Sequence, residues 1–253
     1  MVHRVNASHI GGCLSIADVL AVLYGAVLRV DPARPDWPDR DRYVQSKGHA
    51  AAILYAVLAE RGFFPLSRLE GYCGDGSDLC GHVTNPHLPG VEVSTGSLGH
   101  GLPIASGMAL AAKREQRPVR AFALLSDGEL DEGSNWEAVL FAGHHRLDNL
   151  VAIVDYNKIQ SFGTVSEVLD LELLADKWSA FRWAVREVDG HDIDALLAAF
   201  AATPFEPGHP SVVIAHTVKG KGVSFMENDL AWHYKAPDAA QLARALAEVG
   251  AAG

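Results

Sequence analysis

Two apolar runs of the chain each stop at acidic or amide side chains. One ends at Asp127, and the other ends at Asp155-Tyr156-Asn157, about one strand-helix-strand unit further on. Carboxylate and amide oxygens are ligands that Mg²⁺ prefers, usually together with phosphate oxygens and water. Gly128 lacks a Cβ, so a phosphate can approach the backbone N–H groups beside Asp127. The pattern predicts a metal-bridged phosphate site, although Asp-Gly and Asn-Lys, each taken alone, are more often ordinary turns.

The elements that must position these side chains alternate in type. Strand-like apolar runs occupy residues 119–125, 150–155, 183–189 and 211–217, and helical patterns between them occupy residues 134–146, 168–181 and 192–201. This alternation predicts an α/β fold, with a doubly wound, mainly parallel sheet and helices on both faces. Ligands of such sheets bind outside the carboxyl ends of the strands, which is where the two motifs lie.

The first part of the chain is less regular. Residues 15–28 have helical spacing after Ser15, which we expect to be the N-cap, and the Pro-rich residues 31–43 are expected to form a surface loop. Residues 71–90 are polar, glycine-rich and aperiodic, which is typical of a binding loop. A Gly-rich entry then leads into a helix within residues 96–116.

Composition excludes several classes of function. The 253 residues carry a net charge of -10, and the 21 Lys and Arg are scattered, so we expect no nucleic-acid binding. Three cysteines without a CxxC pair indicate a reducing compartment. The absence of a signal-peptide pattern and of a membrane-spanning apolar run predicts a soluble, cytoplasmic protein. We expect residues 1–253 to form one domain.

The chain resembles the N-terminal, diphosphate-binding part of transketolase, a thiamine diphosphate enzyme. The resemblance covers nearly the whole chain. It rests on five ordered motifs: "ASHIGGCLSIADVLAVLY", "DRYVQSKGHAAAILYAVL", "GHVTNPHLPGVEVSTGSLGHGLPIASGMALA", "SDGELDEGSNWEA" with "IVDYNKIQSFG", and "HTVKGKGVSFMENDLAWHYKAP". Ser126 is a departure, because the family often has Gly at that position.

The resemblance implies a cofactor site. Asp127 and Asn157 would hold Mg²⁺, with Ca²⁺ or Mn²⁺ as substitutes, through their side chains, and Ile159 would do so through its carbonyl. Asn157 would thereby also belong to the thiamine diphosphate site, and Gly128 would present its amide to the diphosphate. Gly96 and Leu98, in the Gly-rich turn, would lie against the aminopyrimidine end.

The resemblance also implies catalytic residues. His49 and His233 match family histidines near the diphosphate and the reacting carbons, and His9 and His82 match histidines of the substrate channel. Two-carbon transfer needs protons to leave and return to hydroxyls, which suits a neutral imidazole. For a single histidine a core or capping role is the better interpretation, but four at motif positions favour catalysis. Glu132 matches an acid between subunits, and a carboxylate at a helix N-terminus is an equal alternative.

Two further positions stay open. Lys219 and Lys221 follow a strand end and would face anions, although a solvated loop charge is at least as good an interpretation.

The resemblance implies a partner as well. A complete transketolase is more than twice this length, so we expect a C-terminal transketolase-like subunit with the pyrimidine-binding and C-terminal domains, in an α2β2 heterotetramer. The expected reaction is reversible two-carbon ketol transfer from a ketose to an aldose, with a sugar or sugar phosphate as substrate. The alternatives are an acyloin-forming or 2-oxo-acid-decarboxylating enzyme subunit, and a non-catalytic scaffold subunit.

Overall fold

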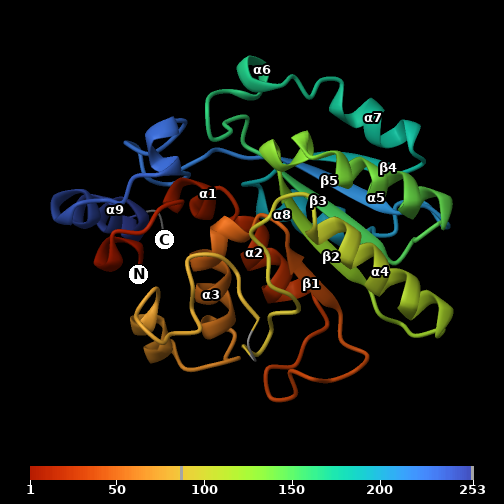
Figure 1. Cartoon of the computed structure of the whole chain (residues 1–253), viewed down its shortest axis with the longest axis horizontal. Helices are drawn as coiled ribbons and strands as arrows, with labels where there is room; N and C mark the ends of the chain where they lie inside the picture. Colours follow the sequence, from red (N-terminus) through yellow and green to blue (C-terminus); the bar gives the residue numbers. More distant parts are fainter. Residues whose placement is uncertain (86–87, 252–253) are drawn as a thin grey trace.

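A parallel β-sheet lies at the centre of the chain (Figure 1). The computed structural model describes residues 1–85 and 88–251. Within them the sheet has five strands in the order β1-β2-β3-β5-β4, and every neighbouring pair is parallel. The strands are β1 (Arg42–Gln45), β2 (Ala121–Ser126), β3 (Leu150–Tyr156), β4 (Ala184–Asp189) and β5 (Ser211–His216). The predicted α/β fold is therefore confirmed.

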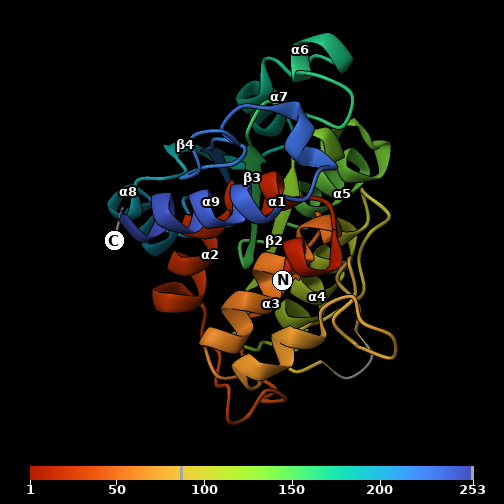
Figure 2. The ribbon, with the colours of Figure 1, turned by 90° about the vertical axis from the view of Figure 1, so that its left-hand side faces the viewer.

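Helices cover both faces of the sheet (Figures 1 and 2). One face carries α4 (Gly101–Arg114), α5 (Gly133–His144) and α7 (Leu174–Ala180), and the other carries α2 (Ala17–Val22), α3 (Ala51–Glu60) and α8 (Ile193–Ala201). The remaining α-helices are α1 (Ile10–Leu14), α6 (Val165–Val168) and α9 (Ala239–Ala251). The short helical turns are η1 (Val2–Val5), η2 (Leu23–Val27), η3 (Gly48–Ala50), η4 (Leu66–Gly71), η5 (Gly128–Asp131) and η6 (Leu230–His233).

The core consists of two layers, one on each face of the sheet. Because successive side chains of a strand point to opposite faces, Phe122 and Leu124 pack with α2, α3 and α8, whereas Ala123 and Leu125 pack with α4 and α5. All residues of β2 and β3 are buried. This explains why both strands read as continuous apolar runs in the sequence.

Three local predictions were wrong. Residues 15–28 do not form one helix capped by Ser15, because Ser15 lies between α1 and α2 and its hydroxyl donates to Gly12 and Asp155. The expected loop at residues 31–43 leads directly into the edge strand β1, whose polar sequence hid it. The helix expected at residues 168–181 is divided into α6 and α7.

The sheet brings the carboxyl ends of β2, β3 and β5 to one edge. Ser126 pairs with Asp155, and Tyr156 pairs with His216, so the segments that follow these residues lie side by side. After β3 the chain crosses one face through α6 and α7, and after β4 it returns across the other face through α8. Within the described ranges, every helix is too short or too polar to cross a lipid bilayer.

Candidate active site

The three predicted metal ligands lie together where β2 and β3 end. Asp127 accepts hydrogen bonds from the backbone N–H groups of Lys158, at 2.6 Å, and Gly128, at 2.7 Å. The side-chain oxygen of Asn157 accepts from the N–H of Ile159 at 3.1 Å. Lys158 has a left-handed backbone with φ 67°, which turns the chain sharply between Asn157 and Ile159. The turn keeps all three groups at the edge of one cavity.

This cavity has a volume of about 270 Å³. It contains nearly all the residues predicted to contact the cofactor. Its lining includes His49, Leu98, Asp127, Gly128, Glu132, Asn157, Ile159, Lys219 and His233. The sheet edge and the Gly-rich turn therefore enclose one shared space.

The donor set fits a magnesium ion bound with a diphosphate. Burial, followed by the charge of Asp155, raises the pKa of the Asp127 carboxyl to about 6, so its ionised form lacks sufficient compensation without a cation. In residues 1–85 and 88–251, no three His, Cys, Asp or Glu side chains gather into a metal site. A site built from one carboxylate, one amide and one carbonyl leaves positions that phosphate oxygens and water can fill.

The raised pKa of Asp127 predicts how the stability of the metal-free chain depends on pH. The folded chain keeps this proton up to about pH 6, while the unfolded chain releases it near the ordinary value of 3.8, so stability falls as the pH rises between these values. The pKa difference corresponds to roughly 3 kcal/mol at pH 7. At pH 7, Asp127→Asn should therefore stabilise the metal-free chain by about 2 kcal/mol. The gain is smaller than the full cost of the charge, because one backbone N–H loses its acceptor.

Urea unfolding of both proteins at pH 5 and pH 7 checks this prediction. Buried neutral histidines destabilise the folded chain as the pH falls, but they do so in both proteins. The difference between the variant and the unchanged chain therefore isolates Asp127. A difference that is the same at both pH values would contradict the assignment.

Lys219 is buried, with 2% of its surface exposed, so the interpretation as a solvated loop charge was wrong for this residue. Its ammonium donates to the carbonyl of Ile159 at 2.9 Å and to Nδ1 of His233 at 3.0 Å. Burial, followed by the charge of Lys47, lowers the pKa of Lys219 to about 8. Lys221 is exposed. Lys219 thus adds a positive charge to the cavity, next to the predicted metal ligands.

The four predicted histidines meet around His9, although they come from distant parts of the chain. The ring centre of His9 lies 5.1 Å from that of His49, 5.1 Å from that of His233 and 5.8 Å from that of His82. The rings of His49 and His233 are 5.8 Å apart. The cluster opens onto the cavity through His49 and His233.

Three of these imidazoles are neutral at pH 7. Burial, followed by the charge of His82, lowers the pKa of His9 to about 4. Burial, followed by Lys219, lowers the pKa of His233 to about 3, and burial holds the pKa of His49 well below its ordinary value. Since an ammonium can only donate, Nδ1 of His233 accepts from Lys219, and Nε2 lies 3.2 Å from the hydroxyl of Ser161. Neutral imidazoles can accept protons from a hydroxylated ligand.

The Gly-rich turn lies against this cluster. A Cβ on Gly96 would stand 3.2 Å from the ring of His82, so a larger residue there would press on the histidine. Leu98 lines the cavity. Glu132 is exposed at its edge, at the N-cap position of α5, and among the described residues its side chain makes no capping hydrogen bond. Both interpretations of Glu132 therefore stay open.

Sequence reasoning missed Glu129, which fastens the Gly-rich turn to the end of β2. This buried carboxylate accepts hydrogen bonds from the hydroxyl of Ser46, from Gly99 N–H at 2.9 Å and from Ser126 N–H at 3.3 Å. It therefore connects the turn that carries Leu98 to the strand end that carries Asp127. An acid in the first turn after Asp-Gly was the available signal.

Glu129→Gln is expected to destabilise the chain by about 2 kcal/mol, because the amide offers one acceptor oxygen in place of two and leaves a buried donor unsatisfied. Thermal and urea unfolding measure this loss. The matched control is Glu60→Gln, since Glu60 is exposed at the end of α3. If the two substitutions have equal effects, Glu129 does not fasten the turn.

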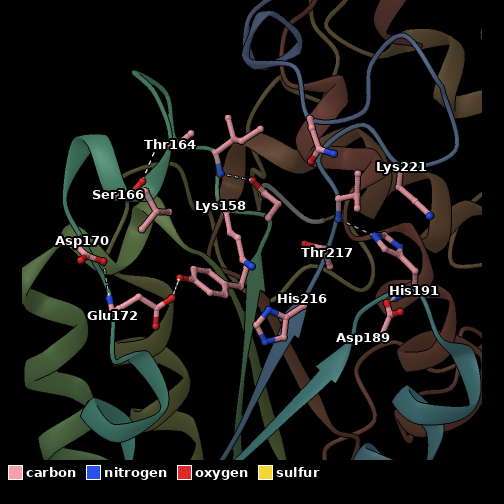
Figure 3. Close-up of a pocket in the computed structure, with 16 residues that line it drawn as sticks. Lys158, Thr164, Ser166, Asp170, Glu172, Asp189, His191, His216, Thr217 and Lys221 are labelled. Carbon is pink, nitrogen blue, oxygen red and sulfur yellow. Dashed lines mark hydrogen bonds between the residues drawn. The ribbon is translucent and has the colours of Figure 1, made fainter.

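A larger cavity, of about 990 Å³, lies beyond the ends of β3, β4 and β5 (Figure 3). Lys158 and Lys221 line it together with His191. The ring of His191 pairs with Asp18 at 2.8 Å and accepts from Val218 N–H at 2.8 Å. Of the predicted catalytic residues, His49, Glu132 and His233 line the smaller cavity. The two cavities share Asn157 and Ile159.

A doubly wound sheet carries the predicted oxygen ligands at two strand ends, beside a cluster of neutral histidines, and this arrangement fits a diphosphate-binding enzyme domain. Residues 1–252 match the family described as "Transketolase, thiamine diphosphate binding domain". The chain belongs to this family of transferases, as its thiamine diphosphate-binding domain.

Similar proteins include components of transketolases. The chain is 45% identical, over 91% of its length and 84% of the relative, to the 6-deoxy-6-sulfo-D-fructose transketolase subunit SqwG of a Clostridium species. It is 43% identical, over 98% of its length and 88% of the relative, to an apulose-4-phosphate transketolase subunit of Phocaeicola vulgatus.

Solved transketolases have the same fold. The structure from Campylobacter jejuni matches 98% of this chain with a TM-score of 0.92 and 32% identity. The chain spans only 40% of that protein, so it corresponds to one part of a full-length transketolase.

Proposed function

We propose that this chain is the N-terminal subunit of a two-component transketolase. Two relatives of similar length are named as transketolase subunits, and the chain covers 40% of a full-length enzyme. The partner would be a C-terminal subunit with the pyrimidine-binding and C-terminal domains, in an α2β2 heterotetramer. In this proposal residues 1–253 form one domain, and the complex works in the cytoplasm.

In the proposed site, Asp127 and Asn157 bind Mg²⁺ through side-chain oxygens, and Ile159 binds it through its carbonyl. Gly128 lies against the diphosphate, and Gly96 and Leu98 lie against the aminopyrimidine. When bound, thiamine diphosphate supplies the nucleophilic carbon that takes up and returns a two-carbon unit. The 270 Å³ cavity holds only part of such a cofactor, in agreement with a site completed by a partner.

The histidines would move protons between substrate hydroxyls and the site. Their lowered pKa values keep His9, His49 and His233 neutral at pH 7. His9 and His49 would accept protons, whereas Nδ1 of His233 already accepts from Lys219, so its Nε2–H would donate. His82 is exposed at the outer side of the cluster, where a sugar would enter. Glu132, exposed at the cavity edge, would meet the partner subunit.

The observation that carries the proposal is the position of the histidine cluster beside Asp127 and Asn157. A diphosphate-binding domain without catalysis would need the oxygen ligands but not neutral imidazoles on the same cavity. The reaction we propose is ketol transfer from a ketose to an aldose. The two relatives are named for 6-deoxy-6-sulfo-D-fructose and apulose 4-phosphate, so sugars with an anionic end are the first donors to test.

The test is turnover by the reconstituted pair. The chain and its partner, mixed with thiamine diphosphate and Mg²⁺, should convert a ketose and an aldose into new sugars, and neither protein alone should do so. Omission of Mg²⁺ or of the cofactor should stop the reaction. Cofactor binding without ketose turnover, but with turnover of a 2-oxo acid, would overturn the transketolase assignment in favour of a decarboxylase.

Phe162 is expected to contribute to partner binding. Its side chain is 85% exposed, yet it lines the cavity edge, and the exposed Leu169 follows just after α6. Exposed aromatic side chains are often central to interfaces, so Phe162→Ser should weaken association by about 2 kcal/mol. Calorimetric titration of the partner measures this, and Leu246→Ser, on the distant α9, is the control. Equal affinities of the two variants would place the partner elsewhere.

A further inference from the structure

Asp155 is the most fully hydrogen-bonded side chain near the site, although the proposed function gives it no role. Only 1% of its surface is exposed. Its carboxylate accepts from the Lys47 ammonium, from the Ser15 hydroxyl at 2.7 Å and from the Thr217 hydroxyl. A fourth donor is the side-chain nitrogen of Asn157, at 3.0 Å. These donors come from four separate segments of the chain.

The bond to Asn157 determines which end of an amide faces the cavity. The nitrogen and oxygen of an asparagine amide differ little in shape, so the side chain can be turned over without a steric penalty. An ionised carboxylate accepts hydrogen bonds and cannot donate them, so Asp155 can hold only the nitrogen end. The oxygen end is then turned toward Ile159, where it accepts the backbone N–H at 3.1 Å.

The other donors keep the carboxylate in place. Lys47 is itself 1% exposed, and it also donates to the carbonyl of Gly12 at 3.0 Å, so its ammonium is anchored from two sides. Thr217 holds the carboxylate oxygen opposite to the one that receives Asn157. The rotation of the Asp155 carboxylate is thus restricted from several directions.

We propose that Asp155 is a positioning residue that keeps the amide oxygen of Asn157 directed at the metal. The inference rests on the proposed function, because it assigns Asp155 a role toward the proposed metal site. Ligands of metal ions are commonly oriented by such outer hydrogen bonds, and loss of one typically costs about 10-fold to 100-fold in metal affinity.

The substitution Asn157→Asp distinguishes the positioning role of Asp155 from the effect of ligand charge alone, because the two predict opposite changes in metal affinity. Aspartate is a charged ligand, so the ligand alone predicts that Asn157→Asp binds a divalent cation at least as tightly. With Asp155 as positioning residue, two carboxylates would face each other across the 3.0 Å that a hydrogen bond now spans. We expect Mn²⁺ affinity, in the presence of thiamine diphosphate, to fall at least about 10-fold.

The exchange Asp155→Asn with Asn157→Asp is the matching rescue. It leaves one carboxylate instead of two, but Lys47 and Ser15 donate to the same oxygen of Asp155 as Asn157 does, so the original pairing is restored only in part. We expect the affinity of the double variant to lie above that of Asn157→Asp and below that of the unchanged chain, because substitutions at residues in contact are not additive. Asp192→Ala is the structural control: it removes the N-cap hydrogen bond of α8, away from Asp155, so it should lower the melting temperature and leave Mn²⁺ affinity unchanged.

Electron paramagnetic resonance of free Mn²⁺ measures affinity, and thermal unfolding shows that each variant is folded. A folded Asn157→Asp chain that binds Mn²⁺ as tightly as the unchanged chain would overturn the positioning role. A folded double variant that stays as weak as Asn157→Asp, or an Asp192→Ala chain that loses affinity equally, would also overturn it. If the unchanged chain binds no Mn²⁺ even with thiamine diphosphate and its partner, the proposed function itself fails.

Discussion

Asp127→Ala is expected to lower Mg²⁺-dependent binding of thiamine diphosphate, and turnover by the reconstituted pair, by about 1,000-fold. The substitution removes a buried carboxylate whose charge a metal ion would compensate. Charge stabilisation by a bound metal ion is worth several kcal/mol, and ~4 kcal/mol corresponds to a factor of about 1,000. The chain should remain folded, because the ionised carboxylate is itself costly without the metal ion. Fluorescence titration of the cofactor at fixed Mg²⁺ measures the loss.

Asp194→Ala is the charge-matched control, because Asp194 is exposed in the first turn of α8, on the other face of the sheet. The loss of cofactor binding and turnover in Asn157→Ala should be smaller than in Asp127→Ala and larger than in Asp194→Ala, since a neutral ligand contributes less than a charged one. Unchanged binding and turnover in both Asp127→Ala and Asn157→Ala would mean that the metal ion binds elsewhere.

Lys47→Met is expected to destabilise the chain by about 3–5 kcal/mol, the largest effect on stability that we predict. The Lys47 ammonium and the Asp155 carboxylate are both buried, with side chains 1% and 0% exposed. Removal of the ammonium therefore leaves the carboxylate as an uncompensated charge in the core. Ser15 and Thr217 still donate to that carboxylate, but they carry no charge. Urea unfolding of the isolated chain gives the free energy directly.

Two comparisons show whether the effect comes from the buried pair. Lys47→Met combined with Asp155→Asn should lose less than Lys47→Met alone, because no unpaired charge remains. Lys113→Met breaks the half-exposed pair with Asp148, and it should cost less than about 1 kcal/mol. A loss for Lys47→Met no larger than that for Lys113→Met would show that the buried pair contributes little.

The strands that build the site were predictable because they are buried on both faces. β2 and β3 lie under helices on each side, so every residue in them is buried and the apolar run is continuous. β1 was missed because it is a short edge strand with the polar sequence Arg-Tyr-Val-Gln. Ser15 was assigned to a helix cap on local grounds, but its hydroxyl bonds to Asp155, 140 residues away. Local patterns carry no information on such partners.

Within the site, motif positions located the ligands and histidines, but they did not show what holds them. Asp127, Asn157 and the four histidines were named in advance. Asp127, Asn157, His49 and His233 line one cavity, and His9 and His82 belong to the ring cluster beside it. Glu129 and the Lys47–Asp155 pair were not predicted from the sequence. A buried charge is recognised by its surroundings, and the residues that surround these charges come from segments far apart in the chain.

The amino-acid sequence was sufficient for the fold class, the family and the strand ends at which chemistry is expected, since these depend on apolar periodicity and on short motifs that persist within single segments. The protonation of the histidines, the burial of Lys219 and the orientation of the Asn157 amide depend on the tertiary structure. Desolvation and charge act through space, so their effects follow from which segments the fold brings into contact. For Asn157 the deciding contact is Asp155, whose carboxylate is held by residues from both halves of the chain.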